Sequence, residues 1–362
     1  MRRVFFYLDD LTSVDTPIID FLHRFEKYAK AIQDVSNSEA ESFSILTSST
    51  LPNPLDTTGI KIERLSRFLP LRFLQSLRTL HRAEGEPTLI AGNNHGALIF
   101  ALAIRIFIPA VRVQASLHGK LSLILSTPTI KSKIRVFLIK VFFPRVDSLR
   151  IVDELEKVSV SEYFRLPESA IVVAPVPVEI PNSVNRHGRT NPNVVGFVGR
   201  IHAERGVREW VDIALAIAAT YSDTEFLVIG DGILATWMKS QTSSLGRRIR
   251  FTGKVDQRSL DSLWNEIGLL LICAPSESYG MAARESLLHG VPVIARNNSS
   301  SEKLHRAYPD IVKTYSDTAD AGSLVSKLFL GEYPRSQFDA FRADMVEAQE
   351  LSLRKLALSW VK

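Results

Sequence analysis

Short, almost continuously apolar runs alternate with helical runs along the whole chain, and this alternation constrains the fold more than any other feature. Runs of this kind are typical of strands that are covered on both faces. We therefore expect parallel sheets flanked by helices, including helices over 207–220 and 280–289. The predicted strands are 4–8, 43–47, 88–92, 111–116, 149–152, 171–174, 194–198, 225–229, 249–252, 269–274, 291–295 and 311–314.

The chain has 362 residues, more than one hydrophobic core usually serves, so about two domains are expected. Residues 179–193 combine proline, asparagine and charge without apolar periodicity, which is typical of a linker. The predicted fold class is α/β, with two Rossmann-like doubly wound domains facing a cleft. We place the first domain at 1–180 and the second at 194–335, and expect 336–362 to form a helix that packs back on the first domain.

Composition excludes several classes of protein. Hydrophobic residues make up 45% and charged residues 23%, unlike a disordered, collagenous or coiled-coil chain. A single cysteine, Cys273, excludes a disulfide framework and fits a reducing compartment. The net charge of +5 gives no argument for nucleic acid. Asp9 and Asp10 interrupt the first apolar stretch, and 97–111 is too short to span a membrane. We expect a cytoplasmic protein, with peripheral attachment to the inner face of the membrane left open.

Charge is concentrated in one block. Residues 87–146 contain no Asp or Glu but eight Lys and Arg. Within this block, 127–143 has the period of a helix whose apolar stripe is Ile130, Ile134, Phe137 and Val141. Two interpretations remain open: a surface in 112–145 that binds anionic lipid or an anionic acceptor, or a core helix with solvated lysines.

Two turns in the second half could lie next to a ligand, and the first of them could hold an anion. Gly199 and Arg200 close a predicted strand, and Arg205 opens the next helix, where free N–H groups and arginine forks suit phosphate oxygens. The alternative is that these arginines pair with surface carboxylates. Gly230 ends the following strand and would let a ligand approach the backbone. Neither GxGxxG nor GxxxxGK[ST] occurs.

Two glutamates mark the strongest local feature, residues 274–295. Glu277 precedes a predicted helix and Glu285 lies inside it, eight residues or about 12 Å further along. Glycosidase acid–base pairs lie about 5–9.5 Å apart, so this pair is better suited to two hydroxyl-rich parts of one long ligand. Alternatively, Glu277 merely complements the helix dipole.

His118 and His95 each follow a predicted strand of the first domain. Both could face a ligand, although turn or packing roles are the alternative. We find no HExxH, no Cys/His cluster and no DxD pair, so no metal site is expected.

These motifs together resemble the family-4 retaining glycosyltransferases of the GT-B fold. The order GRIHAERG, FLVIGDG, FTGKV and PSESYGMAARESLLHGVPVIA matches strongly over 194–300, and Glu277 and Glu285 reproduce the E-x7-E spacing. In the first half the match is thin, mainly SLHGK and VVAPVPVEI. The resemblance implies catalytic roles for His118 and Glu277. It implies donor binding by Arg200, Arg205, Gly230, Lys254, Val255, Tyr279, Gly280, Met281 and Glu285.

The resemblance also implies a reaction. A hexosyltransferase-type enzyme would move a sugar from a UDP- or GDP-sugar to a lipid-linked or cell-surface glycan precursor, with retention and without metal or other cofactor, as in polysaccharide biosynthesis. Two features depart from the family pattern: Arg205 stands where lysine is usual, and 9–17 lacks the glycine-rich loop. The missing loop leaves a non-catalytic GT-B partner subunit as one alternative. A GT-B sugar-nucleotide epimerase, with the same fold but no acceptor, is another.

Overall fold

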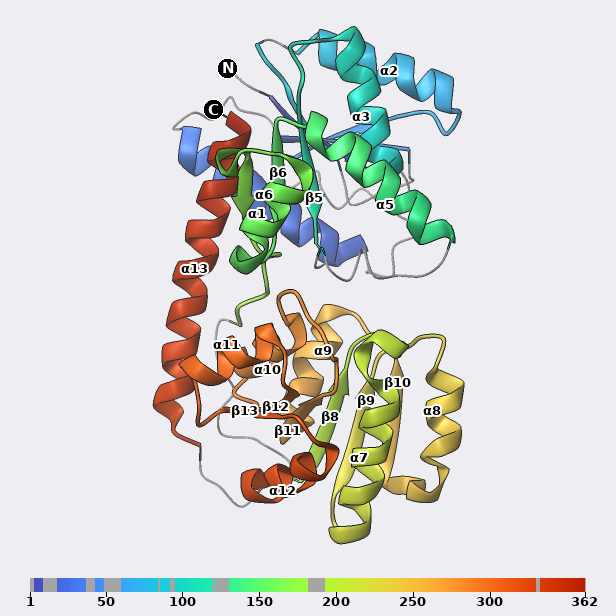
Figure 1. Ribbon diagram of the computed structural model, residues 1–362, viewed down its shortest axis with the longest axis vertical. Helices are drawn as coiled ribbons and strands as arrows, with labels where there is room; N and C mark the ends of the chain where they lie inside the picture. The colour runs from blue at the N-terminus through green and yellow to red at the C-terminus, as the bar shows by residue number, and fades with distance from the viewer. Residues whose placement is uncertain are drawn as a thin grey trace. The chain divides into compact units, whose positions relative to one another are not determined.

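The computed structural model describes residues 3–8, 18–36, 43–48, 60–83, 85–91, 95–118, 121, 130–181, 193–329 and 333–361. The chain divides into two compact units (Figure 1). The N-terminal unit comprises Met1–Pro177 and Ala348–Lys362, and the C-terminal unit comprises Val178–Glu347. The boundary between residues 347 and 348 falls inside the last helix, α13 (Arg335–Val361). The first part of α13 belongs to the C-terminal unit and its last part to the N-terminal unit.

The N-terminal unit is built on a seven-stranded sheet in the order β3-β2-β1-β4-β5-β6-β7, and every pairing in it is parallel. The order runs outward from β1 in both directions, as in a doubly wound sheet. The strands are β1 (Val4–Leu8), β2 (Phe43–Thr47), β3 (Lys61–Arg64), β4 (Thr88–Ala91), β5 (Arg112–Leu117), β6 (Ser148–Ile151) and β7 (Ile171–Val173).

Helices cover both faces of this sheet because successive strand residues point to opposite sides. On one face, Phe5 and Tyr7 enter a core closed by α2 (Leu69–His81), α3 (His95–Phe107), α5 (Ile130–Phe142) and α6 (Lys157–Phe164). On the other face, Val4 and Leu8 enter a core closed by α1 (Ile18–Ser36) and the end of α13.

The end of α13 completes that second core through Trp360. Its indole is buried, packs edge-on to the Tyr28 ring with centroids 5.5 Å apart, and donates from Nε1 to Oε1 of Gln114 over 2.7 Å. The carbonyl of Trp360 also accepts from Oγ1 of Thr88 over 2.7 Å. The last turns of the chain are thus part of the N-terminal unit's core.

The C-terminal unit has a six-stranded parallel sheet in the order β10-β9-β8-β11-β12-β13. Helices α7, α8 and α12 close one face, and α9, α10, α11 and the first part of α13 close the other. The strands are β8 (Val194–Val198), β9 (Glu225–Ile229), β10 (Ile249–Gly253), β11 (Leu269–Ile272), β12 (Val293–Arg296) and β13 (Val312–Tyr315). The helices are α7 (Val207–Thr220), α8 (Ala235–Gln241), α9 (Gln257–Leu263), α10 (Met281–Leu288), α11 (Ser299–Ala307) and α12 (Thr318–Phe329).

The predicted α/β class with two doubly wound parallel-sheet domains is confirmed. Each of the twelve predicted strands has a counterpart within two residues at its start and end. Strand β3 was not predicted, because the sequence KIER has no apolar run. The predicted linker 179–193 lies mostly outside the described residues. In the part of the chain that is described, no helix is long and apolar enough to cross a membrane.

Replacing Trp360 by alanine should lower the free energy of unfolding by about 3–5 kcal/mol, because a large buried ring and its hydrogen bond to Gln114 are lost. Urea unfolding of the whole chain measures this change. The control is Leu351→Ala on the same helix, whose half-exposed side chain should contribute little. A loss below about 1 kcal/mol for Trp360→Ala would contradict the packing described.

Candidate functional site

Most of the predicted donor-binding residues follow the carboxyl ends of strands in the C-terminal sheet. Because all six strands are parallel, these ends lie at one edge, and ligands of such sheets bind where the strand order reverses. In this sheet the reversal lies between β8 and β11. Arg200 follows β8 and Glu277 follows β11, the two strands that flank it, whereas Gly230 follows β9 and Lys254 follows β10.

A close backbone approach joins the turns after β8 and β11. Gly206 has φ +66° and is the N-cap of α7. A Cβ at this position would overlap the carbonyl oxygen of Cys273, just beyond β11. Glycine is therefore required at position 206 for two reasons: the backbone is left-handed there, and no space is left for a side chain. The close approach also brings the preceding residue, Arg205, to the end of β11.

Arg205 forms an ion pair with Glu277 across this junction. The Glu277 side chain is 9% exposed and that of Arg205 is 36% exposed, so the carboxylate is largely buried while the guanidinium reaches the surface. A charge-assisted pair of this kind orients both groups. The two residues are 72 positions apart in the chain, and nothing in the sequence predicted their direct contact.

Arg200 differs from Arg205. Its Nη2 lies 2.6 Å from Oε1 of Glu204, and both side chains are about half exposed. Exposed pairs of this type contribute little to stability. For Arg200, the structure therefore shows the surface pairing that the sequence left open as the alternative to phosphate binding.

Helix α10 begins at the same edge, and no side chain caps its N-terminus. Its N-cap is Gly280, with φ +73° and no side-chain cap. A Cβ on Gly280 would lie 2.9 Å from Oγ of Ser300 and 3.2 Å from Oε2 of Glu277. The first amides of α10, from Met281 on, thus start beside the Glu277 carboxylate, where a helix dipole favours negative charge.

Arg284, which the sequence analysis missed, holds Tyr279 at this N-terminus. The guanidinium lies 3.8 Å from the centroid of the Tyr279 ring and donates to the Tyr279 carbonyl. Tyr279 is therefore positioned by the Arg284 guanidinium that stacks on its ring.

Glu285 is half-buried on the same helix, and its carbonyl lies 2.8 Å from Nδ1 of His289.

The turns after β9 and β10 are equally tight. The amide of Gly230 donates to the carbonyl of Gly253 over 2.9 Å, and a Cβ on Gly230 would overlap the carbonyl oxygen of Gly199. Lys254 is exposed next to this contact, and Val255 packs partly buried on the core. Gly230, a predicted donor-binding residue, therefore lies where two segments of backbone approach each other closely.

Asn298 is a second positioning residue that the sequence analysis missed. It caps α11 by accepting from the amides of Ser300 and Ser301, and its Nδ2 donates to the carbonyl of Ala274 over 3.1 Å. The run Asn-Ser-Ser-Ser is a helix-start signature, so its capping role was readable. Its bond to Ala274, which ties β12 to β11, was not.

His118 lies in the N-terminal unit, directly after β5. Loss of hydration in the surrounding protein, then the charges of Arg150 and Arg24, lower the pKa of His118 to about 3. The imidazole is therefore neutral at physiological pH and can donate or accept a hydrogen bond. His95 begins α3, but its side chain lies outside the described part, as does the glycine-free segment 9–17.

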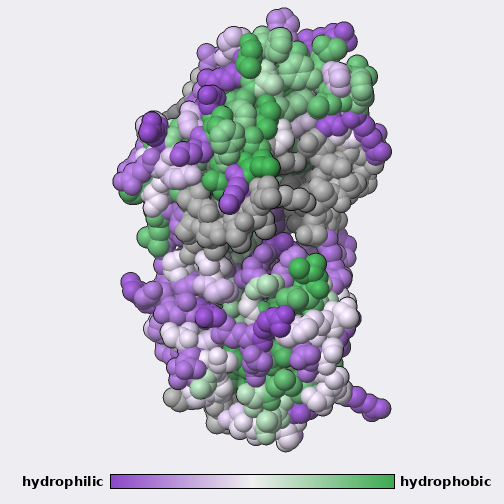
Figure 2. Space-filling view, turned by 45° about the vertical axis from the view of Figure 1, so that its right-hand side comes forward, coloured by the Kyte–Doolittle hydropathy of each residue, from purple (hydrophilic) through white to green (hydrophobic). Residues whose placement is uncertain are grey.

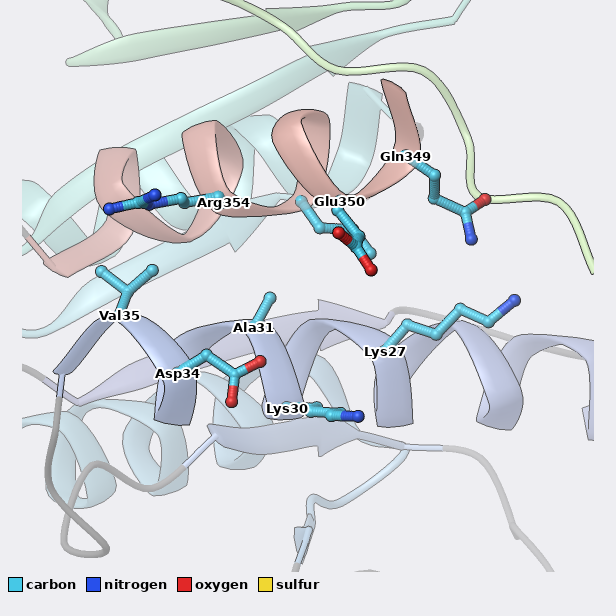
Figure 3. A pocket seen from close by; sticks show the side chains of 9 residues that line it. Lys27, Lys30, Ala31, Asp34, Val35, Gln349, Glu350 and Arg354 are labelled. Atoms are coloured by element: carbon cyan, nitrogen blue, oxygen red, sulfur yellow. The ribbon is translucent and has the colours of Figure 1, made fainter. Parts of the chain in front are cut away.

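One groove lies elsewhere in the N-terminal unit, between α1 and the end of α13 (Figure 3). Its volume is about 640 Å³, and the charged side chains that line it have both signs: Lys27, Lys30, Asp34, Glu350 and Arg354. It includes none of the predicted site residues. Among the described residues, no group of three or more His, Cys, Asp or Glu could hold a metal ion.

Part of the C-terminal unit is similar in sequence to known glycosyltransferases. Residues 192–323 match the family model for glycosyl transferases group 1. A curated relative, the 2-deoxystreptamine glucosyltransferase of Streptomyces kanamyceticus, is 32% identical over 33% of this chain and 32% of its own length. The aligned stretch thus spans about a third of each protein.

Solved structures match over nearly the whole chain. A glycosyltransferase from Rickettsia africae has 14% identity and a TM-score of 0.72, with 99% of this chain and 97% of that chain covered. The Anabaena protein HepE, solved with UDP-glucose, has 15% identity and a TM-score of 0.70, with 98% of each chain covered. This protein therefore has the GT-B fold. Residues 192–323, within its C-terminal unit, are similar to the group 1 glycosyltransferases.

Gly206→Ala should destabilise the protein more than the same change at Gly253, which also has positive φ but has open space around its Cβ position. Gly253→Ala should cost about 1–2 kcal/mol from backbone strain alone. At Gly206 the overlap with Cys273 should add about 1–3 kcal/mol. Urea unfolding of both variants is the measurement, and equal losses would contradict the close approach.

His118 should not titrate between about pH 5 and 8. Because its pKa is lowered in the folded state, its contribution to stability is complete above the ordinary value of 6.5 and is lost as pH falls toward 3. Imidazole NMR shifts across this range, assigned with His118→Gln, measure the titration. A midpoint near 6.5 would contradict the neutral, desolvated imidazole.

Proposed function

We propose that this protein is a retaining, metal-independent glycosyltransferase of family 4 that transfers a hexose from a UDP- or GDP-sugar. One observation carries the proposal: two helix N-termini and the Arg205–Glu277 pair meet where the strand order of the C-terminal sheet reverses. Amide donors next to an arginine suit a diphosphate, and a carboxylate suits sugar hydroxyls. HepE, solved with UDP-glucose, supports a nucleotide-sugar donor.

We assign the diphosphate to Arg205 and to the first amides of α10, at Gly280 and Met281. Arg205 is about one-third exposed, so a ligand can reach its guanidinium while Glu277 keeps it oriented. Arg200 has a similar reach once it leaves Glu204, because that exposed pair is weak. These fixed donors would stabilise the charge that develops on the leaving diphosphate, which is why no metal is required in this proposal.

The remaining roles follow the resemblance. Glu277 would hold the donor sugar together with the backbone of Tyr279, and Glu285 would hold the ribose hydroxyls. Lys254 and Val255 would lie along the nucleobase. His118, neutral at physiological pH, would contact the transferring sugar. We propose that the acceptor is a lipid-linked or cell-surface glycan precursor, since 87–146 contains no acidic residue and would attract an anionic molecule.

A panel of UDP- and GDP-sugars tests this function through release of the nucleotide, with EDTA present and with or without a lipid extract. Extract-dependent release from one donor is the expected result. If EDTA abolished release, the metal-independent mechanism would be wrong. If an isomerised sugar nucleotide appeared instead, an epimerase would replace the transferase. Without release or binding of any donor, the partner-subunit alternative would replace it.

Glu277→Gln should lower turnover about 10²- to 10³-fold, because a neutral amide neither orients Arg205 nor accepts the sugar hydroxyl as strongly. Nucleotide release under saturating donor measures this effect. The matched control is Glu266→Gln, which breaks an exposed ion pair with Arg250 in the same unit and should leave turnover unchanged. Equal effects of the two changes would show that Glu277 has no special role.

A further inference from the structure

We infer that the outward face of helices α2, α3 and α5 docks the N-terminal unit onto an anionic lipid surface. We call this the apolar face. It is marked by large apolar side chains that remain exposed in the folded unit: Phe68, Leu69, Ile106, Phe107, Ile134 and Phe137. Figure 2 shows hydrophobic side chains gathered on this unit, with hydrophilic ones beside them.

These side chains lie on helices that contact one another. Phe107, at the end of α3, packs edge-on to Phe73 of α2 with ring centroids 5.5 Å apart. Helix α3 packs in turn against both α2 and α5. At the end of α3, Ile106 is 77% exposed. Folded proteins rarely expose so many large apolar side chains together unless that surface binds something.

The charge of the same helices indicates what is bound. Helices α2, α3 and α5 contain seven Lys and Arg and no Asp or Glu. Arg105 is paired with Asp147, which lies outside these helices. The charge that the three helices contribute themselves is therefore entirely basic. On the opposite face of the sheet, α1 and the end of α13 carry both signs. Exposed apolar groups among basic residues complement anionic headgroups over an acyl layer.

Helix α5 bears on the two interpretations that its sequence left open. The predicted apolar stripe would be buried in a core helix, but Ile134 is 55% exposed and Phe137 is 64% exposed. Lys133 and Lys140 are exposed on the same helix. The helix therefore presents apolar and basic side chains together, as interfacial helices do. Of the predicted stripe, Ile134 and Phe137 are exposed and Val141 is half-buried.

The docking face also deepens the proposed function. If the acceptor is carried by a lipid, docking would hold the N-terminal unit at the layer that contains it, and this consequence rests on the proposed transferase activity. Lipid binding itself does not depend on catalysis. Sugar-nucleotide binding in the absence of vesicles therefore tests the transferase separately.

Co-sedimentation of the full chain with vesicles tests the docking. Phosphatidylcholine vesicles that contain phosphatidylglycerol should bind the protein at low salt, binding should fall as salt rises, and pure phosphatidylcholine should bind far less. Ile106→Glu and Phe137→Glu should each weaken binding about tenfold or more, since a carboxylate enters the apolar face. Leu351→Glu, a matched change at a 52% exposed site of α13, should not.

Absence of binding to phosphatidylglycerol vesicles, or equal loss with Leu351→Glu, would overturn the inference. A second outcome would also overturn it: the wild-type protein forms a dimer, Ile106→Glu dissociates that dimer, and neither protein binds vesicles. The apolar face would then join two copies of the chain. A second readout avoids charge altogether. The fluorescence of Phe137→Trp should be quenched by brominated lipid in anionic vesicles, and that of Leu351→Trp should not. Quenching of Leu351→Trp without quenching of Phe137→Trp would also overturn the inference.

Discussion

The close approach of Gly206 to the Cys273 carbonyl is the contact on which the candidate site depends. A side chain at 206 would push the turn after β8 away from the end of β11, and Arg205 would then lose Glu277. A glycine with positive φ thus brings together a cation and a carboxylate 72 residues apart. The other glycines of this edge act similarly, since Gly230 meets Gly199 and Gly280 starts α10 beside Glu277.

The site also shows how one residue can satisfy two interpretations. Arg205 pairs with a carboxylate, which was the structural alternative, yet that carboxylate is the proposed sugar ligand and the guanidinium remains partly exposed. The ion pair is therefore consistent with an arginine that is held in place to bind a ligand, rather than with one whose role is only to stabilise the fold. Arg200, whose pair with Glu204 is exposed on both sides, has no comparable support.

Much of the fold and part of the site could be predicted from the sequence. The apolar runs located twelve strands because buried parallel strands are apolar on both faces. Strand β3 was not predicted, because this edge strand contains Lys61, Glu63 and Arg64 and so has no apolar run. The motif order predicted that Glu277 and Arg205 serve one site, but not that they touch, since contact depends on the turn at Gly206. Periodicity also found the α5 stripe, yet period alone does not say which side faces solvent, and Ile134 proved exposed.

The burial of Trp360 in the N-terminal unit has a consequence for synthesis of the chain. The ribosome makes residues 178–347 before it makes 348–361, and these last residues complete the core formed by Tyr28 and Phe43. The first sheet therefore emerges with one face only partly covered, while the second unit already has its whole sequence. On the ribosome, the unit that is made first is the one that finishes folding last.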